Sequence, residues 1–175
     1  MNNAAVFYLP QTLTKDHFDI TLQTNYLGKI FLFASKKARK IEQFSGPFYL
    51  TLKVLPLLSE NSRVVNVSSE AHRLCKSLEL PKSASLFEVY GHSKLCLNLF
   101  TLKLASLLEN KTAVTVDPGN VETNIFRHYP LLSNPVLKRL FWPIRYLTVK
   151  TPEQGAQSVL YAIVSPEITP ACYIR

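Results

Sequence analysis

Short runs of β-branched residues alternate along the chain with longer segments of helical periodicity. Residues 63–69, RVVNVSS, form a buried-strand pattern with a polar end, and residues 112–117, TAVTVD, form a second one. Residues 171–174, ACYI, indicate a short last strand. Strands separated by long helices pair in parallel through right-handed crossovers. The pattern therefore predicts an α/β fold built on a parallel sheet.

Two helix starts are marked by capping boxes, in which a hydroxyl residue is followed three positions later by Glu or Gln. The first lies at 85–88 and begins an apolar helix that extends to about residue 109. The second lies at 151–154, with proline at the first helical position, and its helix extends to residue 166. These two helices would follow the first and second strands and supply the crossovers.

The N-terminal part of the chain gives weaker signals. Residues 2–9, NNAAVFYL, are interpreted as the tail of a strand. Thr14 is expected to cap a helix that continues to Leu27, with apolar residues spaced for one face. Asn25 interrupts that apolar face as a polar, half-buried residue.

Tyr90 and Lys94 are four residues apart, which places them one turn apart on the same helix face. A nearby ammonium favours the phenolate and is expected to lower the pKa of the tyrosine. Such a pair can act as a general acid and base in carbonyl–alcohol chemistry. The spacing is common, however, and an ordinary helix with a half-buried tyrosine and a solvated lysine is the alternative.

The ends of the predicted strands favour the chemical interpretation. Ser68 and Ser69 end one strand, Pro118 and Gly119 follow the next, and Tyr90 begins the helix between them. In parallel sheets, ligands bind at the carboxyl ends of the strands. Three polar features therefore converge on one edge of the predicted sheet.

Composition excludes several other classes of protein. The chain has 175 residues, of which 47% are hydrophobic and 18% charged, as expected for a single globular domain. Its three cysteines show no metal-binding spacing, and their odd number argues against a disulfide framework, so we expect a reducing compartment and no metal site. No run of eighteen apolar residues and no signal peptide is present.

The formal net charge of +8 is concentrated in residues 29–40 and 138–150. Neither patch has the interleaved pattern of aromatic and glycine residues that is typical of a protein that binds single-stranded nucleic acid. Nucleic acid is therefore not expected as a partner. A dinucleotide phosphate or an anionic lipid surface is the alternative explanation of the charge.

Six segments, in order, resemble the short-chain dehydrogenases/reductases, most closely the branch of the retinol dehydrogenases. They are NNAA, LQTNYLG, RVVNVSSEAHRL, YGHSKLCLNLFT, VDPGNVETNI and KTPEQGAQSVLYA. One such motif would be weak evidence, but six in the family's order are specific. The resemblance implies a Rossmann-like, doubly wound parallel sheet, of which this chain would hold the C-terminal part, with the first βαβ units missing.

The resemblance also implies catalytic roles. Tyr90 would donate and accept the proton, and Lys94 would lower its pKa and bind the nicotinamide ribose. Ser69 would hold the substrate oxygen, with Ser68 as the alternative if the register differs by one. Asn25 would hold a water that links Lys94 to solvent; alternatively it only bridges local backbone.

The cofactor would be NADP or NAD, with NADP slightly preferred by resemblance. Pro118, Gly119, Val121 and Thr123 would close over the nicotinamide, and Asn3 would support the sheet beside it. Without the resemblance, Pro118–Gly119 is simply a turn. We expect no metal.

Two features depart from the family's pattern, and a third segment falls where the family carries a substrate lid. The phosphate-binding TGxxxGIG turn is absent, and the five glycines of the chain are not clustered. Residues 29–46 are a basic insert into the segment NYLG–PFYLT; a translated intron is our hypothesis for its origin, and transcript reads across the junction would test it. Residues 129–149, apolar and basic, fall where the family carries a substrate lid, although a helix packed on its own core is an equal alternative.

The sequence therefore predicts one partial domain over residues 1–175, from an NAD(P)-dependent oxidoreductase that interconverts a retinol-like lipophilic alcohol and its aldehyde or ketone. The alternative is an inactive fragment that only binds, dimerises or associates with membrane. The expected partners are a small lipophilic substrate, with a homodimer and a membrane surface left open. The expected location is intracellular, either cytoplasmic or peripheral on the endoplasmic reticulum membrane.

Overall fold

The computed structural model of the chain describes all of the predicted strands and the two capped helices. The described residues are 1–10, 12–15, 17–27, 46–75, 77, 79, 84–123, 125, 135, 139, 143 and 148–175. The predicted insert at 29–46, except for Gly46, and most of the predicted lid at 129–149 lie outside them.

Three parallel strands form the sheet, in the order β1-β2-β3. They are β1 (Arg63–Val67), β2 (Thr112–Val116) and β3 (Tyr173–Ile174). The register pairs Val67 with Val116, so β1 and β2 end side by side. The predicted parallel α/β sheet is thus confirmed, and the polar residues after each strand meet at one edge.

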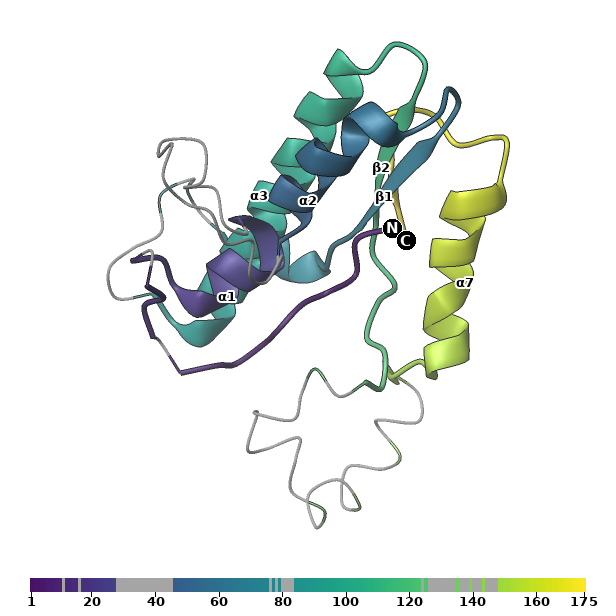
Figure 1. Cartoon of the computed structure of the whole chain (residues 1–175). Helices are drawn as coiled ribbons and strands as arrows, with labels where there is room; N and C mark the ends of the chain where they lie inside the picture. The colour runs from purple at the N-terminus through teal and green to yellow at the C-terminus, as the bar shows by residue number, and fades with distance from the viewer. Residues whose placement is uncertain are drawn as a thin grey trace.

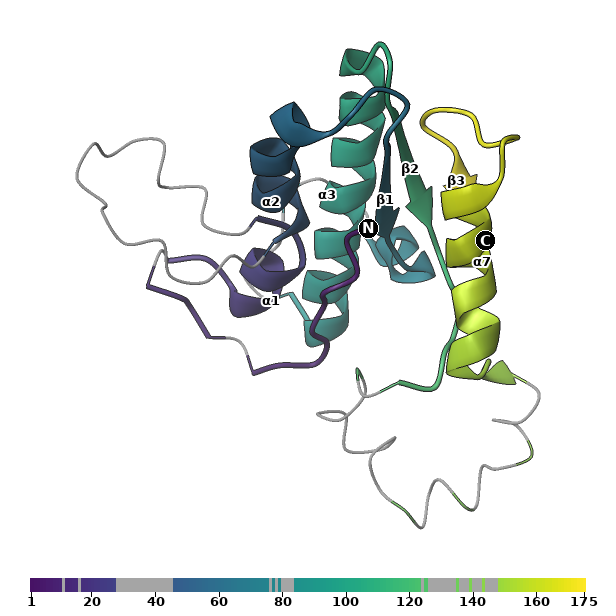
Figure 2. The same cartoon turned by 45° about the vertical axis from the view of Figure 1, so that its right-hand side comes forward.

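Helices cover both faces of the sheet, which confirms the doubly wound arrangement (Figures 1 and 2). On one face lie α2 (Pro47–Val54) and the long α3 (Leu86–Leu107), and on the other lies α7 (Pro152–Val164). Both predicted capping boxes are present, at the start of α3 and at the start of α7. In each box, the two side chains satisfy N–H groups that would otherwise lack partners in the first turn.

The predicted helix from Thr14 is wrong in its start. The helical segment begins with α1 (Ile20–Leu22) and continues as a π-helical turn, η1 (Gln23–Leu27). Asp19 is the N-cap, because its carboxylate accepts hydrogen bonds from the N–H groups of the two residues after Ile20. Thr14 instead lies in a backbone turn, in which its N–H donates to the Phe18 carbonyl at 2.8 Å.

The N-terminal strand tail is reduced to a single residue. Asn2 pairs in parallel with Asn66 of β1, where its N–H donates to Val65 O at 2.8 Å and its carbonyl accepts from Val67 N at 2.9 Å. The apolar run that follows, residues 6–9, is not in a strand. The N-terminus is nevertheless fixed to the edge of β1, as Figure 2 shows.

Two apolar clusters occupy the two faces of the sheet. The first joins α3 to β1 and β2, and its buried members are Val64, Leu97, Phe100, Leu104 and Ala113. The second joins α7 to the opposite face, and its buried members are Val65, Val114, Val116 and Ala162. Alternate residues of each strand therefore point into different clusters, as the period of two requires.

The two pieces that flank the predicted insert lie against each other. Tyr26 of η1 packs on Phe48 of α2 with ring centroids 5.5 Å apart, and Phe48 packs on Phe100 of α3 at 4.8 Å.

Within the described ranges, every helix is too short or too polar for a bilayer span.

Candidate functional site

A pocket of about 530 Å³ lies at the carboxyl ends of β1 and β2. Its size is within the range of about 300–1,000 Å³ that is typical of small-molecule sites. Eight of the nine residues predicted for the site line it: Asn3, Ser69, Tyr90, Lys94, Pro118, Gly119, Val121 and Thr123. The ninth, Asn25, is not among the lining residues.

Tyr90 lies at the start of α3 and is 8% exposed. Its ring packs edge-on against Phe7, with centroids 5.0 Å apart. Burial raises the pKa of Tyr90 to about 12, and a hydrogen bond with the Ser69 side chain only partly opposes this effect. The pKa of Tyr90 therefore lies above that of a free tyrosine and not below it as predicted, because desolvation of the phenolate dominates.

Lys94 follows Tyr90 by one helical turn, and its side chain is almost fully buried. The Lys94 ammonium donates to Val67 O at 2.9 Å and lies 5.6 Å from the centroid of the Tyr90 ring. Burial lowers the pKa of Lys94 to about 8, against the opposing charge of Asp117. Lys94 is thus the group of the pair whose pKa lies near neutrality.

Both serines after β1 reach the pocket. Ser69 caps a 3₁₀ helix, η4 (Glu70–Leu74), by accepting a hydrogen bond from Ala71 N at 3.3 Å, and it also contacts the Tyr90 hydroxyl. The buried Ser68 hydroxyl has no partner among the described residues. Ser69 is therefore the serine that the structure pairs with Tyr90, and Ser68 offers an unsatisfied hydroxyl beside it.

Asn25 connects η1 to the N-terminal segment. It is fully buried; Oδ1 accepts from Val6 N at 2.8 Å, and Nδ2 donates to Val6 O at 2.9 Å. Nδ2 also donates to the Ser93 hydroxyl of α3 at 3.1 Å. The structure thus shows the bridging of backbone that was the alternative interpretation of Asn25. Its role in holding a water stays a prediction.

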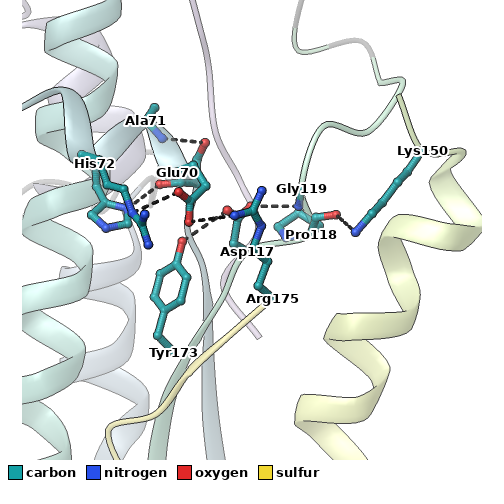
Figure 3. Close-up of polar contacts among 11 residues, drawn as sticks. Glu70, Ala71, His72, Asp117, Pro118, Gly119, Lys150, Tyr173 and Arg175 are labelled. Atoms are coloured by element: carbon teal, nitrogen blue, oxygen red, sulfur yellow. Dashed lines mark hydrogen bonds and ion pairs between the residues drawn. The ribbon is translucent and has the colours of Figure 1, made fainter. Parts of the chain in front are cut away.

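The turn after β2 lines the pocket with Pro118 and Gly119. Figure 3 shows the polar contacts of this turn. Gly119 has a φ of +79°, a conformation that favours glycine. Asp117 Oδ1 accepts from Gly119 N at 2.8 Å, and Lys150 Nζ donates to Pro118 O at 3.2 Å. The turn is therefore held from both sides.

Sequence reasoning missed three residues that shape the site. The sequence pattern predicts Asp117 only as the end of a strand, although a charged residue directly after a buried strand is a signal of function. Phe7 had been assigned to a strand tail, and nothing in the local pattern indicates that its ring packs on Tyr90. Asn2, rather than Asn3, supports the sheet, through hydrogen bonds from its side chain to Asn66 and Thr51.

The described lining fits the nicotinamide end of a dinucleotide. The orphaned Ser68 hydroxyl, the Tyr90 hydroxyl and the Lys94 ammonium supply polar groups on one side. On the other side, Pro118 and Gly119 bring backbone groups to the edge of the pocket. These groups would hold a carboxamide and a ribose, both of which require hydrogen-bond partners.

No protein-family model matches the chain. Curated proteins do. The chain is 34% identical over 176 residues to the human protein "Polyprenol dehydrogenase" and 36% identical over 176 residues to human "Retinol dehydrogenase 12". These alignments cover 96% and 97% of this chain but 48% and 49% of the relatives. The chain thus spans about half the length of the curated relatives it matches.

Solved structures share the fold at lower identity. The landomycin C-6 ketoreductase LanV with bound NADP and rabelomycin has a TM-score of 0.60 and 21% identity, covering 99% of this chain and 57% of that protein. Carbonyl reductase Sniffer of D. melanogaster has a TM-score of 0.54 and 20% identity, covering 98% and 60%. At such identity, these likenesses show the fold alone.

Proposed function

Because the chain belongs to the short-chain dehydrogenase/reductase family, we propose that it acts as an NAD(P)-dependent oxidoreductase on a lipophilic alcohol and its aldehyde or ketone. The observation that carries the proposal is the convergence of Ser69, Tyr90 and Lys94 on one pocket. Ser69 follows β1, and Tyr90 and Lys94 lie in α3, so separate elements bring these three side chains to the same pocket.

In the direction of reduction, the Tyr90 hydroxyl donates its proton to the carbonyl oxygen of the substrate. With its pKa raised to about 12, the phenol is fully protonated at neutral pH and holds the proton that the step needs, although the same high pKa makes it a weaker acid. The Ser69 hydroxyl, already in contact with Tyr90, donates a hydrogen bond to the same oxygen. A bound nicotinamide supplies the hydride in this direction and accepts it in the other.

In the direction of oxidation, Tyr90 has to accept the proton of the alcohol. A buried phenolate is costly, and the Lys94 ammonium 5.6 Å from the ring is the positive charge that offsets this cost. One N–H of Lys94 is used by Val67 O, and an ammonium has three donors. A second donor would reach the ribose of the cofactor.

Apolar residues support a lipophilic substrate. Ala5, Phe7, Phe87 and Ile125 line the pocket beside the polar groups. Retinol and polyprenol are the alcohols that name the curated relatives. We propose a long-chain or polyene alcohol of that kind for this chain, with NADP as the preferred cofactor. A homodimer and a peripheral position on the endoplasmic reticulum membrane belong to the same proposal.

A second candidate is a protein of the same fold that binds without catalysis. One observation favours it: the five glycines of the given sequence include no clustered phosphate-binding turn. In this case the pocket would be retained, but no hydride transfer would occur in it.

The experiment that separates the two candidates is a turnover assay with Tyr90→Phe as the matched control. The variant keeps the aromatic ring that packs on Phe7 and removes only the hydroxyl. We expect the purified chain to reduce retinal with NADPH. The rate of the variant should be lower by at least about a hundredfold, which is the contribution that a general acid typically makes. Equal rates for the two proteins would contradict the assigned role. A folded wild-type chain without turnover would favour the second candidate.

A further inference from the structure

Asp117 is a buried carboxylate to which the proposed reaction assigns no role. It directly follows β2 and is only 2% exposed. Burying an ionised carboxylate costs several kcal/mol or more unless partners compensate for the lost water. A carboxylate held in such a place at the edge of a ligand pocket calls for an explanation.

The direct partners of Asp117 are neutral. Oδ1 accepts from the backbone N–H of Gly119 at 2.8 Å, and Oδ2 accepts from the Tyr173 hydroxyl of β3 at 3.2 Å (Figure 3). These two hydrogen bonds orient the carboxylate, and neither donor carries a positive charge. Its negative charge therefore acts on groups farther away.

Lys94 is the nearby cation on which this charge acts. Its ammonium is bonded to Val67 O, and Val67 is paired in register with Val116, the residue before Asp117. The ammonium and the carboxylate thus lie at the neighbouring ends of β1 and β2. The charge of Asp117 raises the pKa of Lys94 against burial, and it also raises the pKa of Tyr90.

The other charged and titratable groups around Asp117 have contacts of their own. Glu70 of η4 pairs with Arg73 at 3.0 Å and with Arg175 at 3.7 Å. Lys150 binds the Pro118 carbonyl on the outer side of the turn. His72 places its ring 5.4 Å from the Tyr173 ring, and its Nδ1 contacts Ser69 O at 2.7 Å. With Glu70 paired to two arginines, Asp117 is the carboxylate that compensates the buried ammonium.

We propose that Asp117 is a positioning residue whose negative charge, fixed by Gly119 and Tyr173, keeps the buried Lys94 side chain as an ammonium next to Tyr90. The catalytic consequence rests on the proposed function, because an ammonium is what stabilises the Tyr90 phenolate during oxidation. The electrostatic relationship itself does not depend on turnover.

The test is competitive labelling of Lys94 with acetic anhydride at a series of pH values, followed by mass spectrometry of the peptide that contains it. Only the free amine reacts, so the ratio of labelling at pH 7 to labelling at pH 10.5 reports protonation and cancels differences in access. In Asp117→Asn we expect this ratio to rise about fivefold, as a pKa about one lower than the wild-type value of about 8 implies. Tyr173→Phe removes a hydrogen bond but no charge, and its ratio should stay within about twofold of the wild type.

A second neutral variant guards against a misfolded protein. Asp117→Ser retains an oxygen that can accept from Gly119 N, and circular dichroism decides which of the neutral variants is folded. An unchanged ratio in a folded neutral variant would overturn the proposal. The readout needs neither cofactor nor substrate. If the chain shows no turnover but the labelling ratio of Lys94 rises in the neutral variant, the role of Asp117 is supported. The lack of turnover then contradicts the proposed function alone.

Discussion

The side chain of Asn25 and the backbone of Val6 are joined by two hydrogen bonds, of 2.8 and 2.9 Å, which use the N–H and the carbonyl of the same residue. The next residue, Phe7, packs on the Tyr90 ring and lines the pocket. Asn25 therefore connects the turn η1 to the pocket wall without itself reaching the pocket.

Replacing Asn25 by alanine should loosen that wall. The substitution leaves the partly buried backbone groups of Val6 without their Asn25 partner, and we expect a loss of about 2–4 kcal/mol in the free energy of unfolding. Urea denaturation of Asn25→Ala measures it. Asn110→Ala, at an exposed asparagine, is the matched control and should change stability by less than about 0.5 kcal/mol. Equal effects of the two substitutions would show that the Val6 contact is not stabilising.

Gly155 determines the position of Val121 on the pocket wall. A Cβ at Gly155 would lie 2.4 Å from Val121 Cγ2, closer than real atoms approach. We expect Gly155→Ala to cost about 1–3 kcal/mol through overpacking, and Val121→Ala to relieve most of that cost in the double variant. Thermal unfolding of the four proteins in the cycle provides the measurement. Simple additivity of the two substitutions would contradict the contact.

Much of this fold can be predicted from sequence because its signals are local. The capping boxes at 85–88 and 151–154 and the β-branched runs of β1 and β2 each specify their own element. The start at Thr14 could not be predicted, because Asp19 competes for the cap and the chain turns back between the two residues. That choice depends on tertiary contacts and not on local propensity.

A buried polar chain links the N-terminus to α3. Asn2 Nδ2 donates to Asn66 Oδ1 at 2.7 Å, and Asn66 Nδ2 donates to the Thr101 hydroxyl at 2.8 Å. Thr101→Val keeps the shape of the side chain but leaves the Asn66 amide unpaired, so we expect a loss of about 1–3 kcal/mol. Thr112→Val, at a partly exposed position, is the control for urea denaturation. A neutral Thr101→Val would mean that the chain of hydrogen bonds does not stabilise the fold.

Stability should depend on pH through Lys94. The pKa of Lys94 is about 8 in the folded chain, whereas that of an ordinary lysine is 10.5, so between these values the unfolded chain binds more protons. Stability contributed by Lys94 therefore rises as pH increases from about 8 to 10.5, by roughly 2–3 kcal/mol. Lys94→Met removes this rise, and urea denaturation of both proteins at pH 7.5 and pH 10 measures it. Parallel profiles for the two proteins would contradict the low pKa of Lys94.

The sequence indicates which residues gather at the pocket more readily than it indicates their pKa values. Strand ends and a helix start place Ser69, Tyr90 and Gly119 around one pocket, because the carboxyl ends of parallel strands share an edge. The pKa of Tyr90 could not be predicted from its spacing to Lys94, since burial against Phe7 outweighs the neighbouring charge. The effect of Asp117 on the pKa of Lys94 could not be predicted either, because it depends on the register that places the ends of β1 and β2 side by side.

The central claim, that this pocket holds the nicotinamide end of a dinucleotide, is tested most directly by titrating the purified chain with NADPH and NADH while nicotinamide fluorescence is followed. We predict saturable binding that persists in Tyr90→Phe, because the substitution removes a proton donor and retains the ring. Absence of saturation at millimolar concentrations of both cofactors, with a folded chain, would contradict the claim.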